Sequence, residues 1–275
     1  MTLTRVGFMG AGQMGAPMVD RLAAAGTPVA LYARRAEVIT HFRQAGVEVH
    51  LSPAAMASGA EVVIACLYSE AQLREALVGP EGLLAVMDEG SVLAVHTTCS
   101  PGIMAELAAE AEPRGVAVVD APVSGGADDI VAGRLTVMLG GDPAATARVA
   151  PVVAAYSDAI FTTGPLGSAQ AVKLINNTLF AANTQLVAEA ERIGRALGAD
   201  PVMLARVIQR SSGASYVMGL LEQLGSTDAF VGLAGHFIRK DVDVVNAVAA
   251  DIGIDLGLLG EVANADAVDF GASRA

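Results

Sequence analysis

A glycine-rich segment near the N-terminus limits the fold of this chain more than any other feature. It follows the apolar run Val6–Met9, precedes an expected helix, and consists of Gly10-Ala11-Gly12-Gln13-Met14-Gly15. Glycines with this G-x-G-x-x-G spacing permit a tight turn, pack a helix against a strand, and let backbone N–H groups approach a pyrophosphate. The segment therefore predicts a strand–turn–helix unit that binds a dinucleotide, and a purely structural turn is the alternative.

The N-terminal half of the chain alternates short apolar runs with helix-like segments. This alternation is typical of a mostly parallel sheet that helices cover on both faces. The expected strands, rich in Val, Ile and Leu, are Val6–Met9, Val29–Tyr32, Val62–Leu67, Ser91–Val95, Val116–Asp120, Leu135–Leu139 and Ala159–Thr162. The expected helices between them are Gln13–Ala25, Glu37–Gln44, Glu70–Leu77 and Gly102–Glu112.

The pattern changes after Gly164, where Pro165 and Gly167 separate the expected sheet from a helical remainder. We therefore expect an α/β protein with an N-terminal Rossmann-like domain, residues 1–163, whose doubly wound sheet is mostly parallel. An all-α domain, residues 164–275, would follow and begin with a long interdomain helix. Its expected helices are Ser168–Leu197, Pro201–Arg210, Val217–Leu224 and Val231–Ile252.

The charge and cysteine content argue against several classes of protein. The 275 residues include 17 Lys and Arg against 29 Asp and Glu, a net charge of −12 at pH 7. Without a basic tract, this balance disfavours nucleic acid and anionic membranes as partners. No apolar stretch reaches the roughly 18 residues of a membrane span. Two cysteines without metal-ligand spacing predict no metal site and no disulfide scaffold, so we expect a cytoplasmic protein.

The residues after the second expected strand bear on the choice of cofactor. A site for NAD usually has Asp or Glu about 20 residues after the glycines, where it binds the ribose 2′-hydroxyl. Here the chain has Arg34 and Arg35, and the first acid is Glu37. Because arginines bind a phosphate through paired hydrogen bonds, the pair favours NADP(H). NAD is the alternative cofactor, and two solvated arginines are the structural alternative.

A second glycine-containing motif follows the expected strand that ends at Asp120. It lies where open α/β sheets bind ligands, at the carboxyl edge, and consists of Asp120-Ala121-Pro122-Val123-Ser124-Gly125-Gly126. Ser124 offers a hydroxyl, and Gly125 and Gly126 offer backbone N–H groups without side-chain obstruction. These groups suit a small carboxylate, and an ordinary loop is the alternative.

The use of lysine draws attention to two positions. Of the 17 cationic residues, 15 are arginine, and the two lysines are Lys173 and Lys240. Lys173 is the only Asp, Glu, Lys or Arg between Asp158 and Glu189, and its neighbours are apolar. If Lys173 is buried, it would lose its proton more easily and could act as a proton donor near neutral pH. The alternative is that Lys173 is an ordinary solvated charge on the surface. Asn177, four residues on, would share its helix face.

Two histidines and both cysteines lie near these motifs. His96, at the carboxyl end of an expected strand, is either a packed or solvated side chain or hydrogen-bonds a substrate, and His236 has the same interpretations. Cys66 and Cys99 also lie near strand ends, where small apolar side chains suit close packing. We expect neither cysteine to be catalytic.

These motifs together resemble those of the β-hydroxyacid dehydrogenase family, which includes 3-hydroxyisobutyrate dehydrogenase, tartronate semialdehyde reductase and the glyoxylate and succinic semialdehyde reductases. The resemblance covers nearly the whole chain. Its matching segments are the opening signature Val6–Met18, the substrate-binding motif Asp120–Gly126 with residues 133–135 and 138–141, the catalytic motif from Gly164 to Asn177, and the pair Lys240-Asp241.

The resemblance implies an NADP(H)-dependent oxidoreductase that moves a hydride between the nicotinamide and a small 3-hydroxy acid or semialdehyde acid. It also implies that the all-α domain, residues 164–275, binds substrate and forms a homodimer or homotetramer. The implied general acid and base is Lys173. The implied substrate-binding residues are Ser124, Gly125, Gly126 and Asn177. The implied cofactor-binding residues are Gly10, Ala11, Gly12, Gln13, Met14, Gly15, Arg34, Arg35, Leu67, Thr98 and Lys240.

The chain departs from the family's usual pattern at Ala33, Tyr68 and His96, and Gly232–Phe237 lacks an aromatic-rich pattern. These departures leave the identity of the hydroxy acid or semialdehyde open. An imine reductase-like NADPH enzyme is one alternative, although such enzymes generally have Asp or Tyr at the position of Lys173. A decarboxylating 6-phosphogluconate enzyme would need a larger helical domain. A non-catalytic NADP(H)-binding protein is the third alternative.

Overall fold

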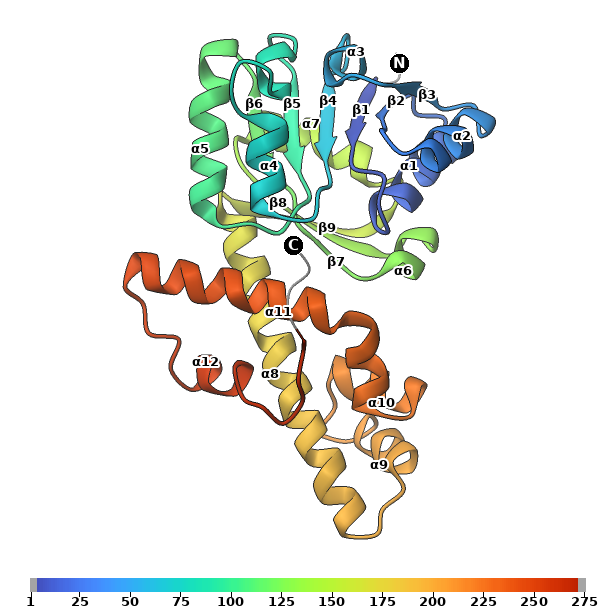
Figure 1. The fold of residues 1–275 in the computed structure, drawn as a ribbon, viewed down its shortest axis with the longest axis vertical. Helices are drawn as coiled ribbons and strands as arrows, with labels where there is room; N and C mark the ends of the chain where they lie inside the picture. The colour runs from blue at the N-terminus through green and yellow to red at the C-terminus, as the bar shows by residue number, and fades with distance from the viewer. Residues whose placement is uncertain (1–3, 272–275) are drawn as a thin grey trace. The chain divides into compact units, whose positions relative to one another are not determined.

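The computed structural model describes residues 4–271 of the chain. The chain divides into two compact units, residues 1–173 and 174–275, and the boundary falls within helix α8 (Ser168–Ala196) (Figure 1). The first unit is a sheet covered by helices, and the second consists of helices. The domain boundary expected between residues 163 and 164 stays a prediction.

The sheet of the first unit confirms the expected Rossmann-like architecture. Among the described residues, its strands lie in the order β3-β2-β1-β4-β5-β6-β8-β7, with β9 beside β8. The pairs from β3 across to β6 are parallel, whereas β8 is antiparallel to β6 and β7. The chain order reverses at β1, where such sheets bind ligands at their carboxyl edge. The strands are β1 (Val6–Met9), β2 (Val29–Tyr32), β3 (Glu48–His50), β4 (Val62–Ala65), β5 (Val92–Val95), β6 (Ala117–Asp120), β7 (Val123–Ser124), β8 (Leu135–Gly140) and β9 (Ser157–Gly164).

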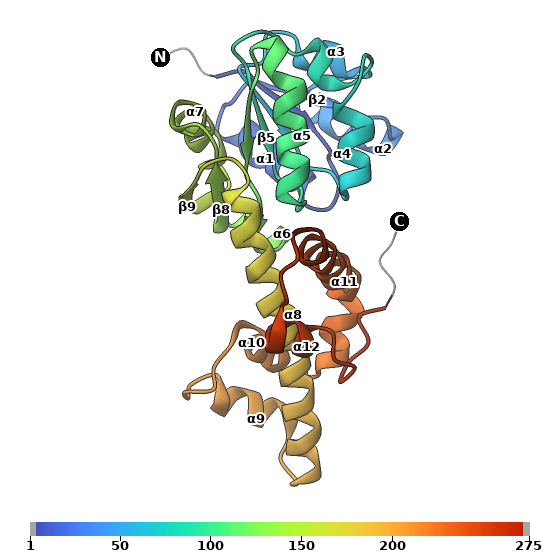
Figure 2. The ribbon, with the colours of Figure 1, turned by 90° about the vertical axis from the view of Figure 1, so that its left-hand side faces the viewer.

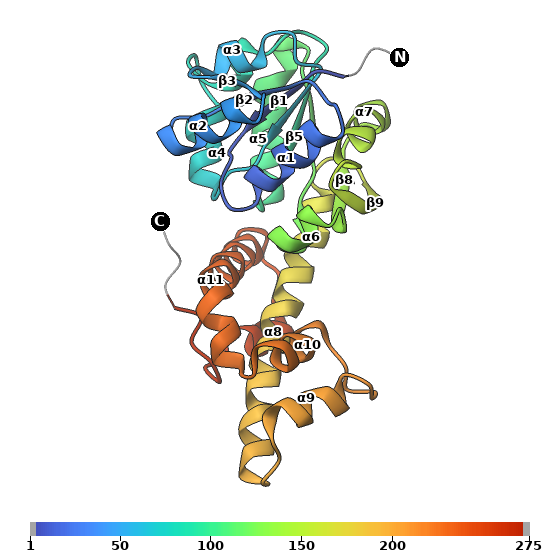
Figure 3. The same cartoon turned by 90° about the vertical axis from the view of Figure 1, so that its right-hand side faces the viewer.

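Helices cover both faces of the sheet because its central strands are buried along their whole length, and alternate side chains point to opposite faces. One apolar layer joins the sheet to α1, α2, α6 and α7, and the other joins it to α3, α4, η1 and α5. Figures 2 and 3 show the first unit from its two opposite sides. Its helices are α1 (Gly15–Ala24), α2 (Ala36–Gln44), α3 (Pro53–Ala57), α4 (Glu70–Leu77), η1 (Leu83–Val86), α5 (Pro101–Ala111), η2 (Glu112–Arg114), α6 (Ala127–Val131) and α7 (Pro143–Val153).

Several elements of the first unit were not predicted from the sequence. Strands β3 and β7 and helices α3 and α6 are too short to show a clear period. Helix α7 is longer, but Pro143 and Pro151 interrupt its pattern. Pro143 is compatible with a helix because it occupies the first turn, where its missing N–H has no intrahelical partner.

The second unit consists of helices, as expected. Its core includes the rings of Phe180 and Phe230, whose centroids lie 5.6 Å apart. Among the described residues, no helix has the length and apolar character needed to cross a membrane. After α8, its helices are α9 (Pro201–Ile208), α10 (Tyr216–Leu224), α11 (Thr227–Ile252) and α12 (Gly257–Ala263).

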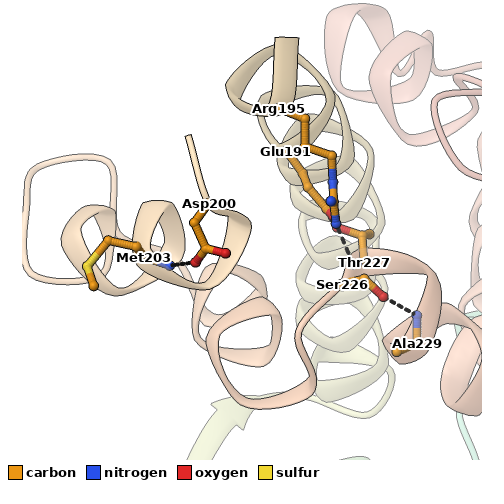
Figure 4. Close-up of polar contacts among 7 residues, drawn as sticks. All are labelled: Glu191, Arg195, Asp200, Met203, Ser226, Thr227 and Ala229. Carbon is orange, nitrogen blue, oxygen red and sulfur yellow. Dashed lines mark hydrogen bonds and ion pairs between the residues drawn. The ribbon is translucent and has the colours of Figure 1, made fainter. Parts of the chain in front are cut away.

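Two side chains determine where α11 begins. The Ser226 hydroxyl oxygen accepts a hydrogen bond from the Ala229 N–H at 3.1 Å, a typical N-cap. The Glu191 carboxylate, which α8 contributes, accepts hydrogen bonds from the N–H and the hydroxyl of Thr227 at 2.9 and 2.8 Å (Figure 4). Arg195 also donates to this carboxylate, at 2.7 Å. The helix therefore starts earlier than the apolar pattern predicted.

The contribution of Glu191 to stability depends on pH. Burial raises the pKa of this carboxyl, but the hydrogen bonds from Thr227 and Arg195 outweigh burial, and the pKa is lowered from its usual value of 4.5. A pKa that is lower in the folded state means stabilisation above pH 4.5 that is lost as the pH falls below that value.

We predict that Glu191→Gln lowers the free energy of unfolding by roughly 1.5–3 kcal/mol at neutral pH, the usual loss for hydrogen bonds to a charged group. The difference from wild type should shrink as the pH falls below 4.5. Glu189→Gln is the matched control, because its ion pair with Arg192 is exposed and solvent weakens such pairs. Urea unfolding over this pH range measures both variants, and a difference that does not change with pH would contradict the prediction.

Candidate active site

The three glycines of the N-terminal motif have three different structural roles. Gly10 has a φ of +107°, and a Cβ there would lie 2.1 Å from the Cys66 carbonyl oxygen. A Cβ on Gly15 would lie 2.0 Å from the Gly10 carbonyl oxygen, so helix α1 packs tightly against the turn. A Cβ on Gly12 would meet nothing within 4 Å. The backbone at Gly12 therefore faces open space.

The open space beside Gly12 adjoins the N-terminus of α1, where the Gly12 carbonyl accepts a hydrogen bond from the Ala16 N–H. The N-cap residue, Met14, makes no side-chain hydrogen bond to this helix end. A helix N-terminus without a side-chain cap presents N–H groups and a partial positive charge. The room beside Gly12 and this uncapped helix end fit the pyrophosphate of a dinucleotide.

The two arginines after β2 have different surroundings. Arg35 Nη2 donates to the Ala11 carbonyl oxygen at 2.9 Å, and its Nη1 lies 3.6 Å from Glu37 Oε1. Arg34 is exposed. Arg35 therefore supports the glycine-rich loop, a structural role that its sequence position did not predict.

The loops after β4 and β5 are joined at the carboxyl edge of the sheet. The Leu67 N–H donates to the Thr97 hydroxyl oxygen at 2.8 Å, and Thr98 is half-buried beside it. The Leu67 side chain also reaches Gly10, where a Cβ would lie 3.2 Å from Leu67 Cδ2. The structure thus places Leu67 beside the glycine-rich loop and joins its backbone to the loop that contains Thr98.

Strand β7 places Ser124 opposite β8 at the same edge. Gly125 has a φ of +125°, and a Cβ there would lie 2.9 Å from the Leu135 side chain, so glycine is required. The Gly126 N–H donates to Asp129 Oδ2 at 2.9 Å. The Gly126 N–H therefore already has a partner within the protein, and the expectation that it binds a substrate stays a prediction. This partner is an acid at the third position of α6 that reaches back to the start of the helix.

His96 packs inside the first unit. Its Nδ1 lies 2.6 Å from the Ala121 carbonyl oxygen and its Nε2 lies 2.8 Å from the Tyr156 hydroxyl, so protein groups occupy both ring nitrogens. Burial lowers the pKa of His96 to about 4, so the ring is neutral near pH 7. Burial also raises the pKa of the Cys66 thiol to about 12, which disfavours the reactive thiolate.

A buried carboxylate anchors the first turn of α8. Gly167 precedes this helix and has no side chain to cap it. Asp120, at the end of β6, supplies the cap: Oδ1 accepts the Gly167 N–H and Oδ2 accepts the Gln170 N–H, both at 2.8 Å. Asp120 is fully buried, and Gly140 leaves room for it, because a Cβ there would lie 2.4 Å from Oδ1. These hydrogen bonds and the positive helix end compensate for the lost hydration of the carboxylate.

The side chain of Gln170 makes a second connection between α8 and the sheet edge. Its Nε2 donates to the Thr97 carbonyl oxygen at 2.9 Å, and its Oε1 accepts the Cys99 N–H at 3.1 Å. The backbone on both sides of Thr98 is therefore held to the first turn of α8. Lys173 follows Gln170 by three residues, so it lies on the same side of the helix, and it is only 8% exposed.

Within the second unit, one carboxylate connects two of the predicted site residues. Asn177 Nδ2 donates to Asp241 Oδ2, and Lys240 Nζ lies 2.9 Å from Asp241 Oδ1. Asn176 also donates to the Asn177 side chain, at 2.9 Å. Asp241 therefore fixes the orientation of Asn177 and neutralises Lys240, although the sequence indicated it only as the neighbour of Lys240.

Two further residues that hold the candidate site together, Asp120 and Gln170, lie within the predicted motifs but had no individual role assigned from the sequence. Asp120 carried a signal, because an acid ends a buried strand while an expected helix begins after Gly167, which offers no capping side chain. Gln170 carried none. Its two partners lie more than seventy positions away in the sequence, and only the folded topology brings them together.

Known proteins resemble this chain over nearly its full length. Residues 5–164 match the family of the NAD binding domain of 6-phosphogluconate dehydrogenase, and residues 167–267 match the family described as NAD-binding of NADP-dependent 3-hydroxyisobutyrate dehydrogenase. The chain is 34% identical to the mitochondrial 3-hydroxyisobutyrate dehydrogenase of Rattus norvegicus over 269 residues, which are 95% of this chain and 80% of that protein. It is 32% identical to the NAD-dependent L-serine dehydrogenase of Pseudomonas aeruginosa over 255 residues, 90% of this chain and 86% of that protein.

A solved structure agrees with these matches. The 3-hydroxyisobutyrate dehydrogenase of Mycobacterium tuberculosis with L-serine has a TM-score of 0.85 and 27% identity, covering 98% of this chain and 97% of that one. The chain belongs to the β-hydroxyacid dehydrogenase family. Within that family, it is an NAD(P)-dependent oxidoreductase that acts on the CH–OH group of a hydroxy acid.

We predict that Asp120→Asn lowers the free energy of unfolding by roughly 1.5–3 kcal/mol, because its amide NH₂ must face a backbone N–H and one hydrogen bond to a charged group is lost. Asp142→Asn is the matched control. Asp142 caps α7 by accepting the Ala144 N–H at 2.8 Å, but it is exposed, and asparagine caps a helix as well as aspartate does. Urea unfolding of both variants checks the prediction, and equally small losses would contradict it.

Proposed function

We propose that this enzyme transfers a hydride between NADP(H) and a small 3-hydroxy acid or its semialdehyde, with Lys173 as the general acid and base. The observation that carries the proposal is a buried lysine three residues after Gln170, whose side chain binds the loop that contains Thr98. A bound nicotinamide would supply the hydride chemistry, and the protein would position the substrate and move one proton.

The proton step explains why a lysine is used at this position. In reduction, the Lys173 ammonium donates a proton to the substrate carbonyl oxygen, and in oxidation the neutral amine accepts the hydroxyl proton. Arginine is the cation at 15 of 17 positions in this chain, but a guanidinium does not release its proton near neutral pH.

The Ser124 hydroxyl and the Gly125 N–H bind the substrate carboxylate. Asn177, which Asp241 holds, orients the substrate.

The substrate class follows from chemistry that the relatives' names share. 3-Hydroxyisobutyrate and L-serine, for which two relatives are named, are both short carboxylates with a primary alcohol at C3 and differ at C2. This shared chemistry supports a 3-hydroxy carboxylate with a hydroxymethyl group. An imine reductase-like activity has less support, because Lys173 carries the proton-transfer role that such enzymes generally assign to Asp or Tyr.

We also propose a homodimer or homotetramer that uses α8. Apolar residues that are 44–56% exposed recur along this helix at Ile175, Leu179, Leu186 and Ile193. Spacings of four and seven residues place them on one side of the helix. An exposed apolar stripe of this kind is typical of a helix that packs against a second copy.

We predict that Lys173→Ala lowers kcat by roughly 10²–10⁴-fold, the usual contribution of a positioned acid–base group, without changing the NADPH dissociation constant. Lys173→Arg is the sharper variant, because it retains the charge but cannot exchange the proton. The KM of Lys173→Arg should rise little, while its kcat should fall as much as that of Lys173→Ala. Lys240→Arg is the comparison, since an ion pair with Asp241 needs only charge, and kcat should fall far less. Steady-state kinetics on short aldehydes and hydroxy acids measure these values, and a Lys173→Arg enzyme with most of its turnover would contradict the proton-transfer role.

We predict that the two arginines differ in their effect on cofactor choice. Arg34→Ala should weaken NADPH binding by about 10–100-fold, the loss of one hydrogen bond to a charged phosphate, and leave NADH binding unchanged. Arg35→Ala should weaken both cofactors, because Arg35 also holds the Ala11 carbonyl. Arg43→Ala, an exposed position near the end of α2, is the control. Fluorescence titration with each cofactor checks this, and equal losses for NADPH and NADH in Arg34→Ala would refute the assignment.

A further inference from the structure

The imidazole of His96 completes the sheet at the point where β5 ends. The backbone ladder reaches this position, because the His96 N–H donates to the Ala65 carbonyl at 2.9 Å and the Ala121 N–H donates to the Val95 carbonyl at 2.8 Å. Beyond it the chain turns away toward α5. The Ala121 carbonyl oxygen instead accepts its hydrogen bond from the His96 ring, 2.6 Å from Nδ1. The His96 ring thus makes the hydrogen bond to Ala121 that a backbone N–H would make if β5 continued.

The Ala121 carbonyl also decides which nitrogen of His96 carries the proton. A carbonyl only accepts hydrogen bonds, so the proton is on Nδ1 and the lone pair is on Nε2. The Tyr156 hydroxyl donates to Nε2 at 2.8 Å, with the two rings edge to face at 5.9 Å. Tyr156 is fully buried and directly precedes β9. The Tyr156 carbonyl accepts a hydrogen bond from the Leu135 N–H of β8, so the Tyr156 backbone is joined to the β8–β9 pair. The phenol ring therefore connects His96 to these two strands.

These two connections reach both sides of the Ser124 loop, which we define as residues 121–126. The loop starts at Ala121, which the His96 ring holds, and its strand part, Val123–Ser124, pairs with β8, which Tyr156 contacts. We propose that His96 is a positioning residue that holds the Ser124 loop, through the Ala121 carbonyl, in the conformation that binds the substrate carboxylate. The Tyr156 hydroxyl holds the ring in the required orientation. This inference rests on the proposed role of Ser124 in substrate binding.

Two amide substitutions separate the two hydrogen bonds of His96. In His96→Asn, the side-chain N–H occupies the place of Nδ1 and still reaches the Ala121 carbonyl. In His96→Gln, the longer side chain reaches toward the Tyr156 hydroxyl instead. We expect His96→Gln to lower kcat/KM by at least about tenfold, mainly through KM for the carboxylate substrate, while His96→Asn stays within about threefold of wild type. The NADPH dissociation constant should change little in either variant, because the His96 side chain contacts Ala121 and Tyr156 and not the glycine-rich loop.

Hydrogen exchange of the backbone in residues 119–126 provides a second measurement that needs no turnover. Exchange in this segment should accelerate in His96→Gln and stay near the wild-type rate in His96→Asn. If His96→Gln does not fold, His96→Ala replaces it, because it also removes the hydrogen bond to the Ala121 carbonyl and should likewise accelerate exchange in the loop. Tyr156→Phe, like His96→Asn, removes the hydrogen bond to Nε2 and keeps the one to Ala121, so loop exchange should accelerate far less than in His96→Gln.

The outcomes distinguish the positioning role from a merely structural one. If KM and loop exchange change equally in the Asn and Gln variants, or follow only their loss of stability, the inference is overturned. It is also overturned if Tyr156→Phe accelerates loop exchange as much as His96→Gln does. If the wild-type enzyme reduces none of the short aldehyde acids with NADPH, the proposed function fails, and loop exchange alone still decides whether His96 holds the loop.

Discussion

The arrangement of the first unit's site depends on the two hydrogen bonds that the Asp120 carboxylate accepts from the first turn of α8. This carboxylate joins the carboxyl edge of the sheet to the helix that carries Lys173, and it does so from a fully buried position. A buried carboxylate without partners would be strongly destabilising, so its two N–H donors and the space left by Gly140 are both necessary. The residue before the helix, Gly167, has no side chain that could cap it.

A common principle connects the other parts of the sheet edge: polar side chains take over where backbone pairing stops. Gln170 binds the backbone around Thr98, His96 replaces a strand residue beside Ala121, and Arg35 holds a carbonyl of the glycine-rich loop. These hydrogen bonds restrict the loops at this edge to the conformations that the structure shows. Such preorganisation is what a hydride-transfer enzyme needs, because its protein groups must position the substrate and manage a single proton.

The sequence predicted the fold class, the central strands and the long helices well, because buried parallel strands and amphipathic helices produce clear apolar periods. It did not predict β3, β7 or α7, whose short lengths or prolines hide the period. For the site, the glycine spacing and the rarity of lysine identified Gly10–Gly15 and Lys173 as candidates. The sequence did not reveal that Asp129 occupies the Gly126 N–H or that Gln170 reaches Thr97, because hydrogen-bond partners are decided by tertiary geometry rather than by local residue type.

The most direct test of this account is the hydrogen-exchange rate of the Gln170 backbone N–H, measured by NMR in the wild-type protein. If Asp120 anchors α8 from inside the fold, this amide opens only with larger unfolding of the first unit. It should then exchange roughly 10³-fold more slowly than the Ala144 N–H, which an exposed aspartate caps at the start of α7. Similar exchange rates for the two amides would show that the first turn of α8 frays freely, and would contradict the claim that Asp120 anchors the helix carrying Lys173.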